Sequence, residues 1–154
     1  MLDPTFLLEP SGARPMATVR YIVDDVDAAI AFYCGHLGFR EVMHPAPPFA
    51  MLARDDLRFT LVSPVGPDEP GGGSRPMEDG TPQQPGGWNR IALEVSDLEG
   101  TVERLKGVGV LFRSGIIHGI GGDQALVQDP SGNLVELFEP KIPEAHERAA
   151  FESD

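Results

Sequence analysis

One pattern of secondary structure, β-α-β-β-β, occurs twice in this chain of 154 residues. When Asp25 is aligned with Asp97, an apolar alternation typical of a strand precedes each aspartate. Apolar residues at helical spacing follow in both copies. These predictions depend on Val19, Tyr21, Val23, Val26, Ile30, Tyr33 and Leu37 in the first copy, and on Ile91, Leu93, Val95, Leu98, Val102, Leu105 and Val108 in the second.

Each copy is short, and its single helix can cover only one face of its sheet. We therefore predict an α+β fold in which two β-α-β-β-β modules form a curved mixed sheet, with their uncovered faces lining a cup. Further strands are expected at residues 39–44, 49–54, 57–63, 110–112, 116–118, 124–128 and 133–138. Asp24 or Asp25 is expected to cap the first helix, and Ser96 with Glu99 to form a capping box on the second.

The two modules are predicted to span residues 17–64 and 88–140 of a single domain. More than half of residues 64–87 are proline or glycine, so residues 65–87 are expected to form a linker without regular structure. Residues 1–16 are expected to be a flexible leader, and residues 141–154 an acidic tail.

The formal net charge is −12 at pH 7, which argues against nucleic acid and anionic membranes as partners. No apolar run approaches the length of a membrane span, and the first residues lack the layout of a signal peptide. Cys34 is the only cysteine, so no internal disulfide can form. We therefore expect a cytoplasmic protein.

A tight turn leads into the last predicted strand, over residues 129–140. Pro130 presets φ and Gly132 can adopt φ > 0, as a turn requires. Glu136 stands in the middle of the apolar run that follows. A carboxylate on a mostly apolar strand requires either a partner or a function.

Two of these segments resemble the vicinal oxygen chelate superfamily, which includes glyoxalase I, the bleomycin-resistance proteins and the extradiol dioxygenases. Residues 25–33, followed by Leu37-Gly38-Phe39, resemble its first helix, and residues 129–140 resemble its closing turn and strand. The similarity covers residues 17–140. The resemblance implies the two-module fold and a homodimer. It leaves the function open, because the family includes lyases, isomerases, epimerases, dioxygenases and non-catalytic drug binders.

The resemblance also implies four positions for metal ligands, which fall on Thr18, Thr60, Arg90 and Glu136. Only Glu136 is a ligand type, whereas a divalent ion needs three or more neutral or anionic donors. Arg90 would place a permanent positive charge against the ion. We therefore predict that the usual metal is not used and that no cofactor is needed. A displaced metal site that uses His44 or His118 is the alternative.

Strand alternation predicts which side chains face the cup. They include Arg20, Arg58, Arg90, Glu94, Glu136 and Phe138, and Trp88, Phe49 and Met51 are further candidates for ligand binding. One hypothesis pairs Arg90 with Glu136, and Arg20 with Glu94, as ion pairs. The other leaves an arginine free to offer its guanidinium fork to a ligand, with the aromatic and methionine side chains supplying apolar contacts.

The leading functional hypothesis is a metal-independent protein that binds a small aromatic or drug-like molecule in the cup. The alternative is a lyase, isomerase or dioxygenase in which Glu136 acts as a general base, or in which a displaced site holds a metal. A third hypothesis is a domain whose proline- and glycine-rich linker serves mainly for association with other proteins. The linker is the only feature of the sequence that supports it.

Overall fold

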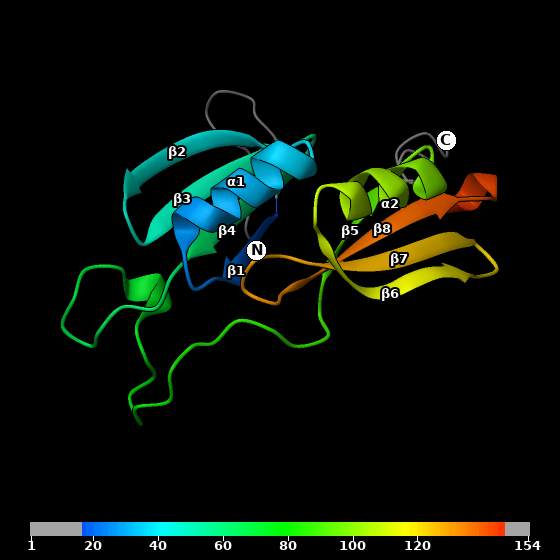
Figure 1. Cartoon of the computed structure of the whole chain (residues 1–154). Helices are drawn as coiled ribbons and strands as arrows, with labels where there is room; N and C mark the ends of the chain where they lie inside the picture. Colours follow the sequence, from blue (N-terminus) through cyan, green and yellow to red (C-terminus); the bar gives the residue numbers. More distant parts are fainter. Residues whose placement is uncertain (1–16, 147–154) are drawn as a thin grey trace, which may run out of the picture.

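The computed structural model of the chain describes residues 17–146, and it contains both predicted modules (Figure 1). In the first module, β1 (Thr18–Ile22), α1 (Val26–His36), β2 (Arg40–Ala46), β3 (Phe49–Arg54) and β4 (Leu57–Val62) form a sheet of order β1-β4-β3-β2. In the second, β5 (Ile91–Glu94), α2 (Leu98–Gly107), β6 (Leu111–His118), β7 (Gly122–Gln128) and β8 (Leu134–Pro140) form a sheet of order β5-β8-β7-β6. The first and last strands of each module pair in parallel.

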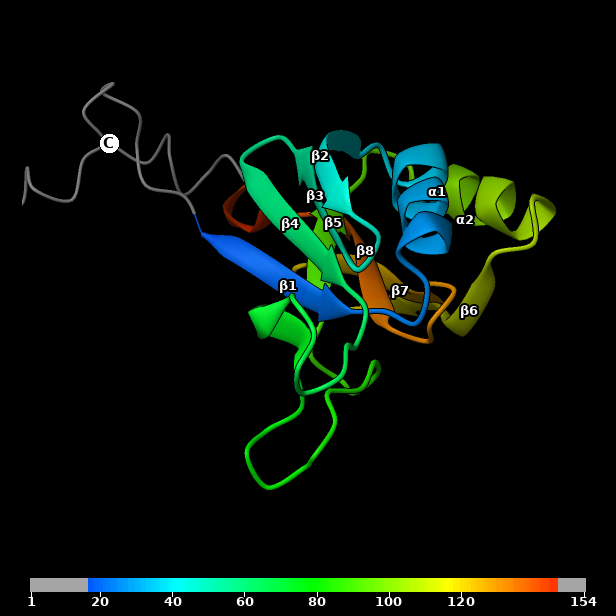
Figure 2. The ribbon, with the colours of Figure 1, turned by 90° about the vertical axis from the view of Figure 1, so that its left-hand side faces the viewer.

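Both helices lie on the same side of the two sheets, and the linker runs on the opposite side (Figures 1 and 2). The residues predicted to lie under the helices are part of one apolar core that includes both modules. Tyr21, Phe59, Leu93 and Leu137 are all buried there, which confirms the predicted strand parity. The opposite face of each sheet is left for a site, and we call it the concave face.

The helix caps confirm one prediction and correct another. Asp25 caps α1, because its Oδ1 accepts a hydrogen bond from the Ala28 backbone N–H at 3.1 Å. The capping box of Ser96 and Glu99 is wrong, since Asp97 caps α2 and accepts from the Gly100 N–H at 3.0 Å. The two modules therefore use the same aspartate cap, at the two positions that align the repeat.

The strand boundaries in the second module also differ from those expected. Residues 111–112 and 116–118 belong to one strand, β6, whose pairing with β7 shifts register twice. Residues 119–122 form the turn of this hairpin, where the Gly119 N–H donates to the Gly122 carbonyl at 2.9 Å. Irregular pairing lets the longer strand accommodate residues that interrupt its apolar pattern.

The linker contains little regular structure, as its composition predicts. Its one regular segment is a short 3₁₀ turn, Gly72–Ser74. Gln83 ties two parts of it together, because its side-chain amide donates to the carbonyls of Gly73 and Arg75 at 3.1 and 2.8 Å. Near its end, the Gly86 N–H donates to Asn133 Oδ1 at 2.7 Å, which fixes the linker to the turn before β8.

Two buried tyrosines of the first module hydrogen-bond to the second module. The Tyr21 hydroxyl donates to the Leu134 carbonyl and accepts from the Ile91 N–H, both at 2.8 Å. The Tyr33 hydroxyl donates to Asp129 Oδ2 at 2.9 Å. Burial raises the pKa of both phenols, so they remain neutral donors.

The buried Asp129 carboxylate organises the turn that receives these bonds. Besides the Tyr33 bond it accepts from the backbone N–H groups of Ser131 and Asn133 and from the Asn133 side-chain amide, at 2.9 to 3.0 Å. The same Asn133 amide donates to the Ile22 carbonyl at 2.8 Å. The turn is therefore part of the joint between the modules.

In the part of the chain described, no helix is long and apolar enough to cross a membrane.

We predict that Tyr21→Phe lowers the free energy of unfolding by about 1–3 kcal/mol, because it leaves the buried Ile91 N–H without its acceptor. Urea denaturation of purified protein measures the change. Ser131→Ala is the control, since it removes only the bond from the exposed Asp24 N–H and should cost less than about 1 kcal/mol. Equal, small losses in the two variants would contradict the role given to Tyr21.

Candidate functional site

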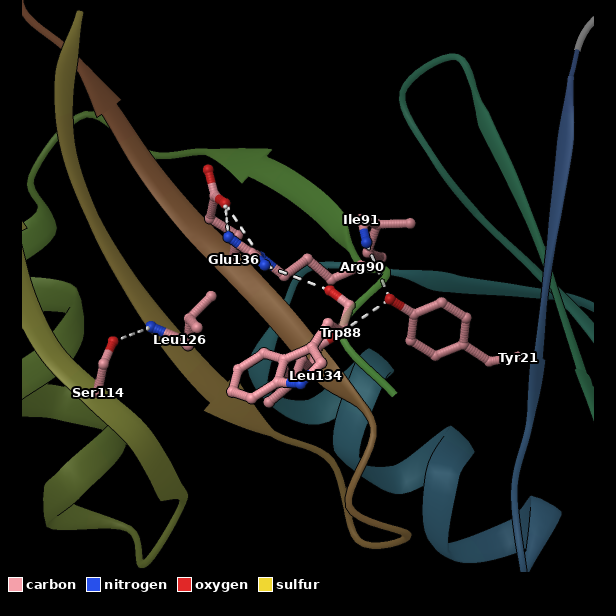
Figure 3. Close-up of polar contacts among 8 residues, drawn as sticks. All are labelled: Tyr21, Trp88, Arg90, Ile91, Ser114, Leu126, Leu134 and Glu136. Carbon is pink, nitrogen blue, oxygen red and sulfur yellow. Dashed lines mark hydrogen bonds and ion pairs between the residues drawn. The ribbon is translucent and has the colours of Figure 1, made fainter. Parts of the chain in front are cut away.

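The concave face of the second module carries a cluster of polar side chains on β5, β7 and β8. The register places Ala92 beside Glu136, and Leu126 on the other side of Glu136. Arg90 lies just before β5 and reaches along the sheet to Glu136 (Figure 3). The side chain of Arg90 is 27% exposed and that of Glu136 is 16% exposed.

Arg90 and Glu136 form the predicted ion pair. Nε and Nη2 of Arg90 both donate to Oε1 of Glu136, at 3.1 and 3.0 Å, and Nη1 donates to the Trp88 carbonyl at 3.2 Å. With its amide nitrogen turned toward Glu136, Gln124 donates to both carboxylate oxygens, at 3.1 and 3.2 Å. The carboxylate is thereby neutralised and hydrogen-bonded, as a half-buried charge requires.

The four positions that the resemblance assigns to metal ligands do not fit a divalent ion. Glu136 is occupied by the guanidinium of Arg90, which is itself one of the four. Thr60 is buried, and its hydroxyl donates to the Val19 carbonyl at 3.4 Å, while Thr18 is exposed at the start of β1. A cation in this place would meet a fixed positive charge and a single carboxylate, which Arg90 already engages.

The two histidines of the alternative site lie on the other side of the sheets. His44 Nδ1 is 3.9 Å from carboxylate oxygens of Asp27, on α1, and of Glu41. His118 Nδ1 is 2.9 Å from Asp123 Oδ1, beside the start of α2. Neither is placed near Glu136. Among residues 17–146, no group of three or more His, Cys, Asp or Glu side chains could hold a metal ion.

A cavity of about 240 Å³ opens beside the Arg90–Glu136 pair, on the same concave face. It is lined by Gly87, Trp88, Arg113, Gln128, Gly132 and Leu134. Trp88 is 63% exposed, and the guanidinium of Arg113 lies over its indole, 5.2 Å from the ring centroid. Figure 3 shows the indole beside Leu134, in front of β8. The cavity therefore offers an aromatic surface, an amide and a cation to a bound molecule.

The other predicted residues of the first module lie on its own sheet. Arg20 donates from Nη1 to the Gly73 carbonyl of the linker at 3.3 Å. Arg58 Nη2 contacts Met51 Sδ at 3.3 Å, and Phe49 is half-buried opposite Val62. These residues form a second group, separate in the fold from the cluster on β5, β7 and β8.

Glu94 and Phe138 complete the predicted set and are paired neighbours on β5 and β8. Glu94 Oε1 lies 3.5 Å from His146 Nδ1. Phe138 is half-buried and packs against Gly122, where an added Cβ would come within 2.8 Å of its Cζ. Both are on the concave face but farther along the strands than the cavity at Trp88.

Sequence reasoning missed Arg113, Gln124 and Gln128. The two glutamines follow the period of two along β7, which is a usable signal once β7 is recognised. Arg113 carries no such signal, because the register of β6 shifts between Phe112 and Ser114. Strand alternation alone does not indicate which side of the sheet such a residue faces.

Comparisons with known proteins agree with this fold. A family model described as the Glyoxalase/Bleomycin resistance protein/Dioxygenase superfamily matches residues 16–137. A search of curated proteins finds no match.

Solved structures with the same fold come from several bacteria. An antibiotic-binding protein, TnmS3, from Streptomyces sp. CB03234 is 22% identical, with a TM-score of 0.62, over 84% of this chain and 98% of that one. A superfamily member from Sphaerobacter thermophilus DSM 20745 is 25% identical, with a TM-score of 0.64, over 82% of this chain and 98% of that one. The fosfomycin resistance protein FosX from Listeria monocytogenes is 17% identical, with a TM-score of 0.63, over 87% of this chain and 99% of that one.

We predict that Arg90→Gln lowers the free energy of unfolding by about 1–3 kcal/mol, because the Glu136 carboxylate then keeps only Gln124 as a side-chain partner. Adding Glu136→Gln should recover part of this loss, which a double-mutant cycle measures. Arg113→Gln is the matched control and should cost less than about 1 kcal/mol, since its cation–π contact is exposed. Strictly additive effects of the Arg90 and Glu136 changes would contradict the coupling.

Proposed function

Because the chain belongs to the Glyoxalase/Bleomycin resistance protein/Dioxygenase superfamily, we propose that it binds a small aromatic or drug-like molecule on the concave face of its second module, without a divalent metal. The observation that carries this proposal is the exposed Trp88 indole in a cavity beside a carboxylate that Arg90 already neutralises. Such a surface favours a flat apolar molecule with a few polar groups.

The residues around Trp88 suggest how the ligand is held. The indole offers a face for stacking, and Leu134 adds apolar contact next to it. Arg113 can donate to a carbonyl or a phenolate at the edge of the ligand, and the Gln128 amide can both donate and accept. Arg90 and Glu136 neutralise each other, so the charge that this part of the face offers to a ligand is that of Arg113. The antibiotic-binding activity of TnmS3 supports the same class of ligand.

The enzymatic alternative makes a different demand on Glu136. A general base must accept a proton from its substrate, and it must lie within hydrogen-bond reach of that proton. Glu136 Oε1 instead accepts two bonds from Arg90, and Gln124 can donate to both oxygens. The structure therefore favours a structural role for Glu136, and we place the enzymatic alternative among the outcomes of the experiment below.

A homodimer is part of this proposal. Parts of the concave face are open, since Trp88, Arg58 and Thr18 are all exposed on it. A second copy lying over this face would exclude water from the cavity and enclose a ligand on more sides. Sedimentation velocity with and without ligand tests this part separately.

Trp88 is the only tryptophan of the chain, so its fluorescence reports directly on the cavity. We expect planar polycyclic antibiotics, screened as a panel, to quench this emission saturably and to raise Tm. Trp88→Phe should weaken binding of the active compound, and Trp88→Ala should weaken it about tenfold or more, as measured by calorimetry. Met77→Ala, which shortens an exposed apolar side chain of the linker, should bind normally.

Two results would contradict the proposal. One is a panel in which no compound binds, or in which Trp88→Ala binds as tightly as the original chain. The other is stoichiometric metal in protein purified without chelator, together with loss of ligand binding after treatment with EDTA. Turnover of a bound compound that Glu136→Gln abolishes would support the enzymatic alternative.

A further inference from the structure

A second cavity, of about 220 Å³, lies on the helix-covered side of the sheets, where the two modules meet. Its walls come from both modules and include His36, Arg54, Thr101 and Arg104, and its floor includes the buried Leu93 and Leu137. This cavity is on the opposite side of the sheets from Trp88 and Glu136. We call it the junction cavity.

Two arginines at the junction cavity bridge the modules in opposite directions. Arg54, at the end of β3, donates from Nη2 to the Glu94 carbonyl of β5 at 3.4 Å. Arg104, on α2, donates from Nη2 to the His36 carbonyl at the end of α1, also at 3.4 Å. Each module thus sends one guanidinium to a backbone carbonyl of the other.

Both bonds are long compared with the usual 2.9–3.0 Å, so they hold the guanidinium groups weakly. A guanidinium has five N–H donors, and each inter-module bond uses one of them. The side chain of Arg54 is only 22% exposed, and its closest carboxylate contact is Asp55 at 3.9 Å, which is itself 81% exposed. The described residues that line the junction cavity include no aspartate or glutamate. Two cations therefore border a small, partly enclosed space in which unused donors remain.

We propose that the junction cavity binds a small oxyanion of the phosphate class between Arg54 and Arg104. A tetrahedral dianion can accept two hydrogen bonds from each guanidinium fork, and arginine recognises phosphate oxygens in this way. The low exposure of Arg54 reduces the screening of its charge by water. The site adds to the function proposed for the concave face and does not depend on it.

Bound oxyanion would tie the two modules together, because its ligands come from β3 of one module and α2 of the other. An anion that binds only when both arginines are in place stabilises the joined, folded state through mass action. Occupancy of the junction cavity by the anion would therefore raise the free energy needed to separate the two modules.

Inorganic phosphate is the probe for this site. We expect phosphate to raise Tm saturably at millimolar concentration, relative to sodium chloride at equal ionic strength, and calorimetry to show one site per chain. Arg104→Gln should weaken phosphate binding at least tenfold, and Arg104→Lys, which keeps the charge and loses the fork, should weaken it less. Arg104 is exposed, so these variants are expected to fold normally.

Lys106→Gln is the matched control, because it removes one positive charge from the same helix. The Lys106 ammonium lies over the Phe112 ring, 5.4 Å from its centroid, and does not line the junction cavity. This variant should bind phosphate like the original chain. Arg54→Lys tests the second arginine of the site and keeps its positive charge, and a melting curve without phosphate checks that the variant folds. We expect this variant also to bind phosphate less tightly than the original chain does.

Three results would overturn the proposal. Chloride at equal ionic strength could give the same rise in Tm as phosphate. Arg104→Gln and Lys106→Gln could lose the same amount of affinity. The original chain could also show no saturable binding of phosphate or sulfate in calorimetry. None of these results bears on ligand binding at Trp88, which lies on the opposite side of the sheets.

Discussion

The structure depends on a hydrogen-bonded joint between the modules, centred on the buried hydroxyl of Tyr21. This one oxygen donates to β8 and accepts from the first residue of β5, so it fixes the position of β1 against the parallel pair that begins the second sheet. Asp129 and Tyr33 make a second buried connection nearby. Because buried polar groups are costly without partners, these bonds favour one arrangement of the modules over others that would bury a similar apolar area.

Much of this fold could be predicted from the sequence. Strand parity follows directly from which side chains are apolar, which is why Leu93 and Leu137 were placed correctly under the helices. The cap of α2 was misplaced because Ser96 and Asp97 are both good cap residues, and only the backbone geometry decides between them. The alternation predicts that Tyr21 is buried but does not reveal partners that are 70 and 113 residues away.

The candidate site was predicted less completely, for reasons that are also physical. The pairing of Arg90 with Glu136 could be foreseen, because opposite charges on the same face of neighbouring strands tend to meet. Arg113 could not be placed, since an irregular register removes the link between residue number and sheet face. The sequence also predicts one cup shared by both modules, whereas the cavity at Trp88 is lined only by residue 87 of the linker and by residues of the second module. A tethered guanidinium, unlike a metal ion, cannot be exchanged or removed, so the charge around Glu136 is permanent.

The joint between the modules also has a consequence for the order in which the protein matures during its synthesis. The first module leaves the ribosome long before the turn that accepts the Tyr33 hydroxyl and the carbonyl that accepts the Tyr21 hydroxyl have been made. Until then its two phenols must remain hydrated, because burying them would leave their hydroxyls without partners. The nascent first half therefore cannot close its core alone, and final packing waits for residues near the other end of the chain.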